Sequence, residues 1–197
     1  AFEPKTLNMV KNVSVSKAIA DWEQGQLNLS FLDSPVPTVL DAKDVDPALA
    51  AHGIAADKMM LILNKNHNYT PFHIDAATTG GGWMYLAEGT KVWQMIDYQD
   101  GGFLLENKKF RDPGMADLLY ENGHALWGKI YHTSIDSGDF LYFPPGTIHR
   151  VWTYAASFGV GGYATCDLDA TRVPPLNQWM KDNYVNPLYG VWNGIED

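Results

Sequence analysis

The sequence predicts an all-β core, a small sandwich or barrel, within a single domain. From residue 58 onward, short apolar segments are separated by turn residues at intervals of roughly 8 to 12 residues, the spacing of strands in such folds. The chain has 197 residues, of which 46% are hydrophobic, enough for one well-packed core. No internal repeat or low-complexity segment divides it, so we expect one domain over residues 1–197.

The first 57 residues predict a helical flank and a first strand. Ser16 could cap a helix that Gly25 ends. Residues 27–32 alternate between apolar and polar side chains, as a half-buried strand does. A short helical segment is expected over residues 47–52.

The core strands are expected between residues 58 and 165. They cover residues 59–63, 69–75, 83–87, 90–97, 129–135, 140–143, 148–154 and 157–165. Glu88 and Gly89 predict a hairpin between the third and fourth of these strands. The segment around residues 115–121 is expected to be helical, and residues 166–197 predict a tail of helix and loop. The strand pattern favours a double-stranded β-helix, the double-sheet jelly roll of the cupin kind.

Composition and charge restrict the partners and the compartment. The net charge of -9 argues against nucleic acid and is compatible with a small-molecule or a protein or peptide substrate. No apolar run is long enough to span a membrane. Cys166 is the only cysteine, so an internal disulfide and a cysteine zinc site are excluded, which indicates an intracellular compartment, cytoplasm or nucleus. The chain starts at Ala1 without Met, which indicates a trimmed start or a numbering of its own.

Two histidines and one aspartate form a candidate metal site. Residues two apart on a strand point to the same side, so His73 and Asp75 can face one point. His149 begins another strand directly after a Pro-Pro-Gly turn and can supply a second imidazole. A His-x-Asp pair is weak alone, because such pairs arise by chance. Two histidines and one carboxylate around open positions are typical of non-haem Fe(II) oxygenases.

A lysine on the strand 90–97 adds to this candidate site. Lys91 has the parity of Trp93 and Met95, which we expect to face inward. An inward lysine is costly unless it is paired, and an anionic ligand would supply the pair. A lysine that snorkels from a strand edge is the alternative, and the pattern alone leaves both open.

Other residues are expected to line the pocket or to lie outside the site. Arg150 follows His149 directly, so it should point to the opposite side of the strand. Some aromatic residues are candidates for the pocket wall, although each could equally belong to the core. They are Trp83, Tyr85, Trp93, Trp152 and Tyr163. Histidines expected outside the site are His52, His67, His124 and His132.

Three segments resemble the JmjC family of Fe(II)/2-oxoglutarate oxygenases, members of the cupin superfamily. They are residues 68–75 (NYTPFHID), 89–93 (GTKVW) and 137–149 (SGDFLYFPPGTIH). The sequence is most similar to the histone lysine demethylase branch that carries F-box or PHD-finger domains. Residues 27–33 are similar to an early strand of that branch, so the resemblance covers roughly residues 27–165.

The resemblance implies roles for six residues. His73, Asp75 and His149 would bind Fe(II), while Thr70 and Lys91 would hold the distal carboxylate of the cosubstrate 2-oxoglutarate. O2 would take the last open position on the metal. The branch has a cosubstrate-binding tyrosine where this chain has Met84, and the neighbouring Tyr85 is the candidate to replace it.

The implied activity is hydroxylation of a C–H bond in a protein side chain or a small molecule, with succinate and CO2 as coproducts. N-methyl-lysine demethylation by the same chemistry is an alternative. A non-catalytic cupin-like binding module and a cupin with manganese or zinc are alternatives of other classes. A homodimer could use the N-terminal helix and the C-terminal tail as its interface.

Overall fold

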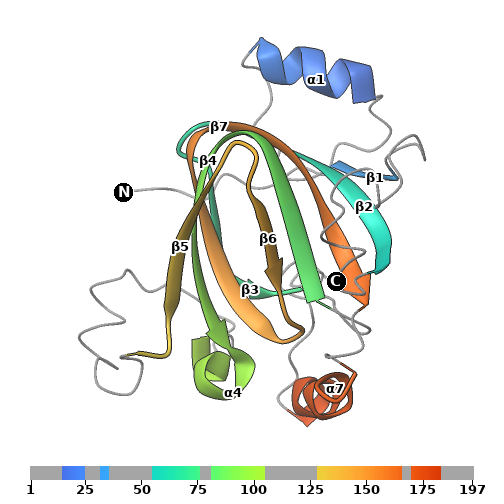
Figure 1. The fold of residues 1–197 in the computed structure, drawn as a ribbon, viewed down its shortest axis with the longest axis vertical. Coiled ribbons are helices and arrows are strands. Elements are labelled where there is room, and N and C mark those ends of the chain that lie inside the picture. The colour runs from blue at the N-terminus through green and yellow to red at the C-terminus, as the bar shows by residue number, and fades with distance from the viewer. Residues whose placement is uncertain are drawn as a thin grey trace, which may run out of the picture.

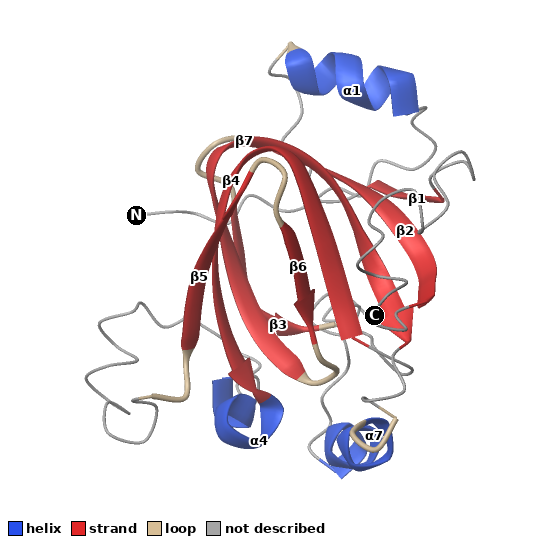
Figure 2. Cartoon of the chain, in the orientation of Figure 1, coloured by secondary structure: helices blue, strands red, loops and turns tan. Residues whose placement is uncertain are grey.

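A computed structural model of the chain describes residues 15–24, 32–35, 55–75, 81–104, 128–165 and 170–182. The main feature of this part is one antiparallel sheet of seven strands (Figure 1). Few helices accompany the sheet (Figure 2). The prediction of an all-β core is therefore confirmed for the described residues.

The elements follow one another along the chain in a fixed order. They are α1 (Val15–Glu23), β1 (Leu32–Pro35), β2 (Ala55–Asn64), β3 (Tyr69–Ile74), β4 (Gly81–Asp97), α4 (Tyr98–Gly101), the 3-10 helix η1 (Gly102–Leu104), β5 (Tyr131–Asp136), β6 (Phe140–Phe143), β7 (Thr147–Thr165) and α7 (Val173–Asp182). The strand order is β1-β2-β7-β4-β5, with β3 paired to β7 and β6 paired to β4.

Two long strands, β4 and β7, form the centre of the sheet. They have 17 and 19 residues and pair with each other from Gly81–Ala164 to Asp97–Thr147. Figure 1 shows both strands bending at the top of the view. The ladder is irregular at this bend, where its register shifts between Leu86 and Lys91.

The predicted hairpin at Glu88–Gly89 is wrong. The segments 83–87 and 90–97 belong to one strand, β4, and both pair with β7 instead of with each other. A tight two-residue hairpin of type I′ needs positive φ at both central residues, and only Gly89 has it (φ 99°). The chain therefore bends at Gly89 and does not reverse. The segments 148–154 and 157–165, predicted as separate strands, are likewise one strand, β7.

The bend divides the sheet into two halves. In the β6 half, β2 and β6 flank residues 81–88 of β4 and residues 157–165 of β7. In the β5 half, β3 and β5 flank residues 90–97 of β4 and residues 147–155 of β7. Side chains from both halves pack together on one side of the sheet. We call this side the inner face and the opposite side the outer face.

Each face of the β5 half is packed by its own hydrophobic cluster. The inner cluster joins residues from both halves: Met84, Leu86, Trp93, Ile135, Phe143 and Val151. The cluster on the outer face of the β5 half also includes residues from the helices: Phe72, Ile74, Ile96, Tyr98, Leu104, Ile148, Leu176 and Met180. Because neighbouring residues of a strand point to opposite sides, β4 and β7 supply both clusters.

The remaining predictions have mixed outcomes. The strands 59–63, 69–75, 129–135 and 140–143 are confirmed as β2, β3, β5 and β6, with shifted ends. The N-terminal helix is confirmed as α1, although Ser16 lies inside it and not at its cap. A helix in the C-terminal tail is confirmed as α7.

Several predictions fall outside the described residues. They concern residues 27–31, 47–52 and 115–121, Cys166, and the tail beyond residue 182. In the part of the chain that is described, no helix has both the length and the apolar character needed to cross a membrane.

Close contact between β4 and β7 in the β6 half requires glycine. A Cβ atom on Gly159 would lie 2.5 Å from the carbonyl oxygen of Tyr85, and backbone cannot move aside cheaply. We expect Gly159→Ala to lower the free energy of unfolding by about 3 kcal/mol, as overpacked cores do. Urea denaturation measures this change.

Gly138→Ala is the control for that substitution. Gly138 has φ +95° but nothing within 4 Å of a Cβ atom, so only backbone strain is expected, about 1 kcal/mol. An equal loss in both variants would contradict the steric explanation.

Candidate metal centre

The two predicted histidine ligands lie opposite each other on neighbouring strands. His73 of β3 pairs with His149 of β7 in the antiparallel ladder, and their ring centroids are 4.2 Å apart. Phe72 and Ile74, on either side of His73, belong to the outer cluster. Alternation along β3 therefore turns His73 to the inner face.

Asp75, the residue that follows β3, completes the group. Its Oδ1 lies 3.6 Å from His73 Nε2, and its Oδ2 lies 4.0 Å from His149 Nε2. One ligand atom from each of the three residues lies within 4.8 Å of the others. Donors that share a metal at about 2.1 Å are about 3 Å apart, so closing this group around an ion needs shifts of about 1 Å or less. The predicted convergence of the three residues is confirmed.

His149 is held in the tautomer that can bind a metal. Its Nδ1 lies 3.0 Å from the carbonyl oxygen of Thr147, which can only accept, so Nδ1 carries the proton and Nε2 keeps its lone pair. Burial and the neighbouring His73 lower the pKa of His149 from 6.5 to about 4, against opposing effects of Asp75 and the Thr147 carbonyl. The imidazole is therefore neutral at neutral pH, as a metal ligand must be.

Aromatic rings surround His149 on the inner face. The ring of Trp93 stacks at 5.3 Å between centroids, and the ring of Phe143 lies at 4.6 Å. Trp93 was among the predicted wall residues, and it lies beside the candidate metal centre. Its Nε1 is buried and has no hydrogen-bond partner among the described residues.

Lys91 lies on the same face as His149. In the β4–β7 ladder Lys91 pairs with Thr153, and Met95, four residues along β4, pairs with His149. Lys91 is only 3% exposed, so the inward position is confirmed and the snorkelling alternative is wrong. Its role toward a ligand stays a prediction.

The partners of Lys91 are neutral. Its Nζ donates to Asn64 Oδ1 at 2.5 Å and to Thr153 Oγ1 at 3.0 Å. Within the described ranges no carboxylate lies at salt-bridge distance from it. Desolvation by burial lowers the pKa of Lys91 from 10.5 to about 7. Ser157, opposite Asn64 in the ladder, adds a buried hydroxyl that finds no hydrogen-bond partner in the described part.

Asn64 and Thr153 were not identified from the sequence. Thr153 could have been found, because it has the parity of His149 on the same strand. Asn64 reaches Lys91 only because β2 pairs with the second half of β7 and the sheet bends between them, a long-range register that no local signal contains.

The structure separates the two other predicted cosubstrate residues. Thr70 pairs with Val151 and shares the inner face with His149. Tyr85 does not, because Met84 and Leu86 on either side of it belong to the inner cluster. Alternation therefore turns Tyr85 to the outer face of the β6 half, and assigning it to the cosubstrate site is a mistake that the strand geometry corrects.

The same alternation sorts the other expected residues. Tyr163 pairs with Gly82 and so shares the side of the inner cluster, while Trp83 lies on the outer side with Tyr85. Trp152 points away from the metal centre. Arg150 also lies on the outer face, as predicted, with its guanidinium carbon 4.5 Å from the Phe72 ring centroid and 4.6 Å from that of Trp152.

No protein-family model matches the chain, and no curated protein matches it.

Metal affinity tests the three-residue group directly. We expect His149→Ala to weaken binding of Fe(II) more than about 100-fold, beyond the loss caused by removing a residue that only hydrogen-bonds to a metal ligand. Anaerobic calorimetric titration with Fe(II) measures this. His132→Ala is the matched control, because His132 is an exposed histidine of the same sheet that does not belong to the group. Equal losses in the two variants would exclude this site.

The buried lysine predicts a dependence of stability on pH. Between pH 7 and 10.5 the unfolded chain keeps the Lys91 proton and the folded chain has lost it, so stability rises with pH over this range. We expect Lys91→Met to flatten the rise and to add up to about 5 kcal/mol to the free energy of unfolding at pH 6. Urea denaturation at pH 6 and pH 10 measures both effects.

Lys129→Met is the control for the pH experiment. The side chain of Lys129 is 47% exposed and pairs with Asp100 on the surface. Its removal should leave the slope between pH 7 and 10 unchanged. A parent chain without any rise in stability over this range would contradict the assignment of a buried, deprotonated amine.

Proposed function

We propose that the chain is an Fe(II)- and 2-oxoglutarate-dependent dioxygenase built on a double-stranded β-helix. It hydroxylates a C–H bond of a protein side chain or a small molecule, with O2 as oxidant and with succinate and CO2 as coproducts. The observation that carries the proposal is the convergence of His73, Asp75 and His149 on the face where Lys91 is buried.

The fold is compatible with this function. Besides their segments of β4 and β7, the β5 half holds β3 and β5 and the β6 half holds β1, β2 and β6; the inner cluster takes residues from both halves. We expect the two halves of the sheet, which share this core, to correspond to the two layers of a jelly roll. The metal ligands lie at the end of β3 and the start of β7, at one end of the β5 half.

The donor set fits Fe(II). Two imidazoles and one carboxylate on one side of an ion leave its other positions open, the arrangement of non-haem iron oxygenases. Iron and a chelated 2-oxo acid would supply the oxidising chemistry with O2, while the protein supplies orientation and electrostatics. His149 contributes a neutral imidazole with Nε2 available, and Trp93 and Phe143 exclude water from its flank.

Lys91 and Thr70 suit the distal carboxylate of a diacid. An ammonium has three donors, and Lys91 uses two of them on Asn64 and Thr153, which leaves the third for a carboxylate. Lys91 lies four positions along β4 from Met95, the partner of His149, a distance of about 13 Å at 3.3 Å per residue. The lysine side chain spans part of this distance, and a five-carbon diacid chelated to the metal would span the rest.

A buried lysine with no carboxylate partner among the described residues also needs a reason to persist. Burial destabilises the charged ammonium form of Lys91 relative to the neutral amine, which lowers its pKa. A dianionic cosubstrate would raise that pKa again, because it provides the missing opposite charge. Binding would therefore take up a proton above pH 7.

Turnover tests the proposal. With Fe(II), 2-oxoglutarate and O2, we expect the chain to form succinate, even without a substrate through uncoupled turnover. His73→Ala should abolish it. Lys91→Met should raise the KM for 2-oxoglutarate at least about tenfold, the scale of a charge-assisted hydrogen bond, with a smaller effect on kcat.

The controls and contrary outcomes are as follows. Lys129→Met should leave KM unchanged, because this lysine is on the surface. No succinate under any condition would favour a non-catalytic binding module. Activity that manganese or zinc restores after chelation, and Fe(II) does not, would assign another metal. Formaldehyde released from methyl-lysine peptides would assign the substrate class to demethylation.

A further inference from the structure

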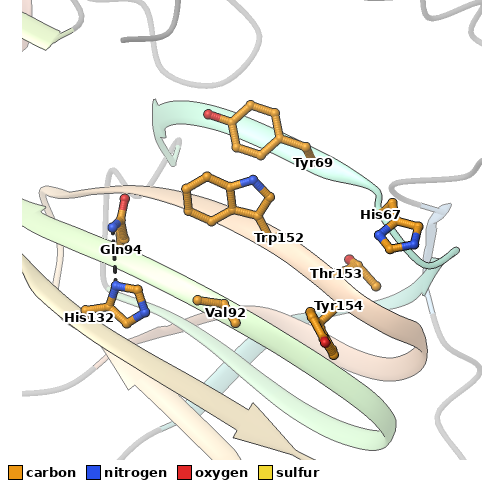
Figure 3. Close-up of a pocket in the computed structure, with 8 residues that line it drawn as sticks. All are labelled: His67, Tyr69, Val92, Gln94, His132, Trp152, Thr153 and Tyr154. Carbon is orange, nitrogen blue, oxygen red and sulfur yellow. Dashed lines mark hydrogen bonds between the residues drawn. The ribbon is translucent and has the colours of Figure 1, made fainter. Parts of the chain in front are cut away.

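A second candidate site lies on the outer face of the β5 half, at the level of Lys91 and Trp93 along β4. It is a hollow of about 620 Å³. It is lined by His67, Tyr69, Val92, Gln94, His132, Trp152, Thr153 and Tyr154 (Figure 3). The lining residues come from β3, β4, β5 and β7 and from the turn before β3. Neither the metal ligands nor Lys91 line it, although Thr153, a hydrogen-bond partner of Lys91, does.

The hollow exists because one small residue lies among large ones. Val92 of β4 pairs with Trp152 of β7, and Gln94, the next residue on this face, pairs with His132 of β5. Figure 3 shows Val92 between His132, Trp152 and Tyr154. The large side chains form a rim, and Val92 forms the floor.

An aromatic pair forms one wall of the hollow. The rings of Tyr69 and Trp152 lie 5.0 Å apart between centroids with 30° between their planes. The guanidinium of Arg150 supports the indole of Trp152 from within the fold. Tyr154, on the opposite rim, is 72% exposed, a large aromatic surface left to solvent.

A hydrogen-bond chain fixes the polar end of the hollow. Arg150 Nε can only donate, and it lies 2.6 Å from Gln94 Oε1. The amide nitrogen of Gln94 therefore faces His132 Nδ1 at 3.2 Å and donates to it. In neutral His132 the proton is then on Nε2, which remains as a donor at this end.

The lining restricts the chemistry of a ligand. Among the described residues that line the hollow there is no Asp, Glu, Lys or Arg, and most of their exposed surface there is carbon. Among these residues a charged ligand finds no side chain of opposite charge, and the net charge of -9 disfavours nucleic acid further. The aromatic rings offer flat apolar surface, and the imidazole, phenol and indole groups offer donors at its edge.

We propose that this hollow binds a proline-rich peptide in the polyproline II conformation. Such a peptide is uncharged, its pyrrolidine rings pack flat on aromatic side chains, and it has carbonyl acceptors but few N–H donors of its own. Its preformed helix loses little entropy on binding, so an open, aromatic-lined groove can hold it. The exposed Tyr154 and the Tyr69–Trp152 pair receive the rings, and His132 Nε2 donates to a carbonyl. The proposal does not depend on the proposed oxygenase activity.

The test uses the isotope-labelled full chain and acetyl-(Pro)10-amide as the probe. We expect saturable amide shifts by NMR that include β5 and the 150–154 segment of β7, and no shifts with a (Gly-Ser)5 peptide. Tyr154→Ala should weaken binding at least about tenfold, as loss of a central aromatic contact does. The exposed position of Tyr154 makes this variant compatible with folding. Val92→Phe, which fills the floor, should weaken binding to the same extent.

Two variants serve as controls. Tyr131→Ala removes an aromatic side chain that is also exposed, at 69%, but lies outside the hollow, and it should leave the affinity unchanged. His73→Ala disables the candidate metal centre and should also bind the peptide normally.

Three outcomes would overturn the proposal. They are the absence of saturable binding, an affinity insensitive to both Tyr154→Ala and Val92→Phe, and tighter binding of cellohexaose than of the peptide. The last outcome would assign the hollow to an oligosaccharide.

Discussion

The pairing of β4 with β7 along their full lengths is the constraint on which the rest of the structure depends. This ladder sets His149, Val151 and Thr153 opposite Met95, Trp93 and Lys91. The ladder therefore fixes the distance along the sheet between the metal ligand His149 and the buried amine of Lys91. It also decides which residues face the metal centre and which face the outer cluster, because a shift of one residue would exchange the two faces. The bend at Gly89 then brings the β6 half over this face and encloses Lys91, so that Asn64 can reach it.

Two buried basic side chains lie on opposite faces of this ladder, and their surroundings differ. Arg150 is held by Gln94 and lies between two aromatic rings, so its weakly hydrated guanidinium is well accommodated as a structural group. Lys91 has two neutral oxygen partners and a strongly lowered pKa. An ammonium is a compact, strongly hydrated charge, so burial among neutral groups suits it poorly. This contrast assigns Arg150 to stability and favours a ligand-binding role for Lys91.

Much of the candidate site could be predicted from the sequence because strand alternation is a local rule. Alternation predicts that His73 and Asp75 point to the same side, that Lys91 points inward and that Arg150 points outward. The same rule turns Tyr85 away from the cosubstrate site, because its neighbours Met84 and Leu86 face inward. The sequence suggests Tyr85 only because it is next to Met84, the position of the tyrosine in the resembled branch. The continuity of β4 and β7 and the contact of Asn64 with Lys91 could not be predicted, since they depend on pairing between residues far apart in the chain.

Thr153 connects the two faces of the sheet. Its hydroxyl accepts a hydrogen bond from Lys91 on the inner face. Its backbone carbonyl accepts from His67 N at 2.7 Å, its backbone nitrogen donates to Asn68 O at 2.8 Å, and it also lines the hollow with His67. A ligand in the hollow that moved the His67 turn would therefore move the backbone that carries a partner of Lys91. Thr153 therefore joins the hollow to the Lys91 site through one hydroxyl and two backbone hydrogen bonds.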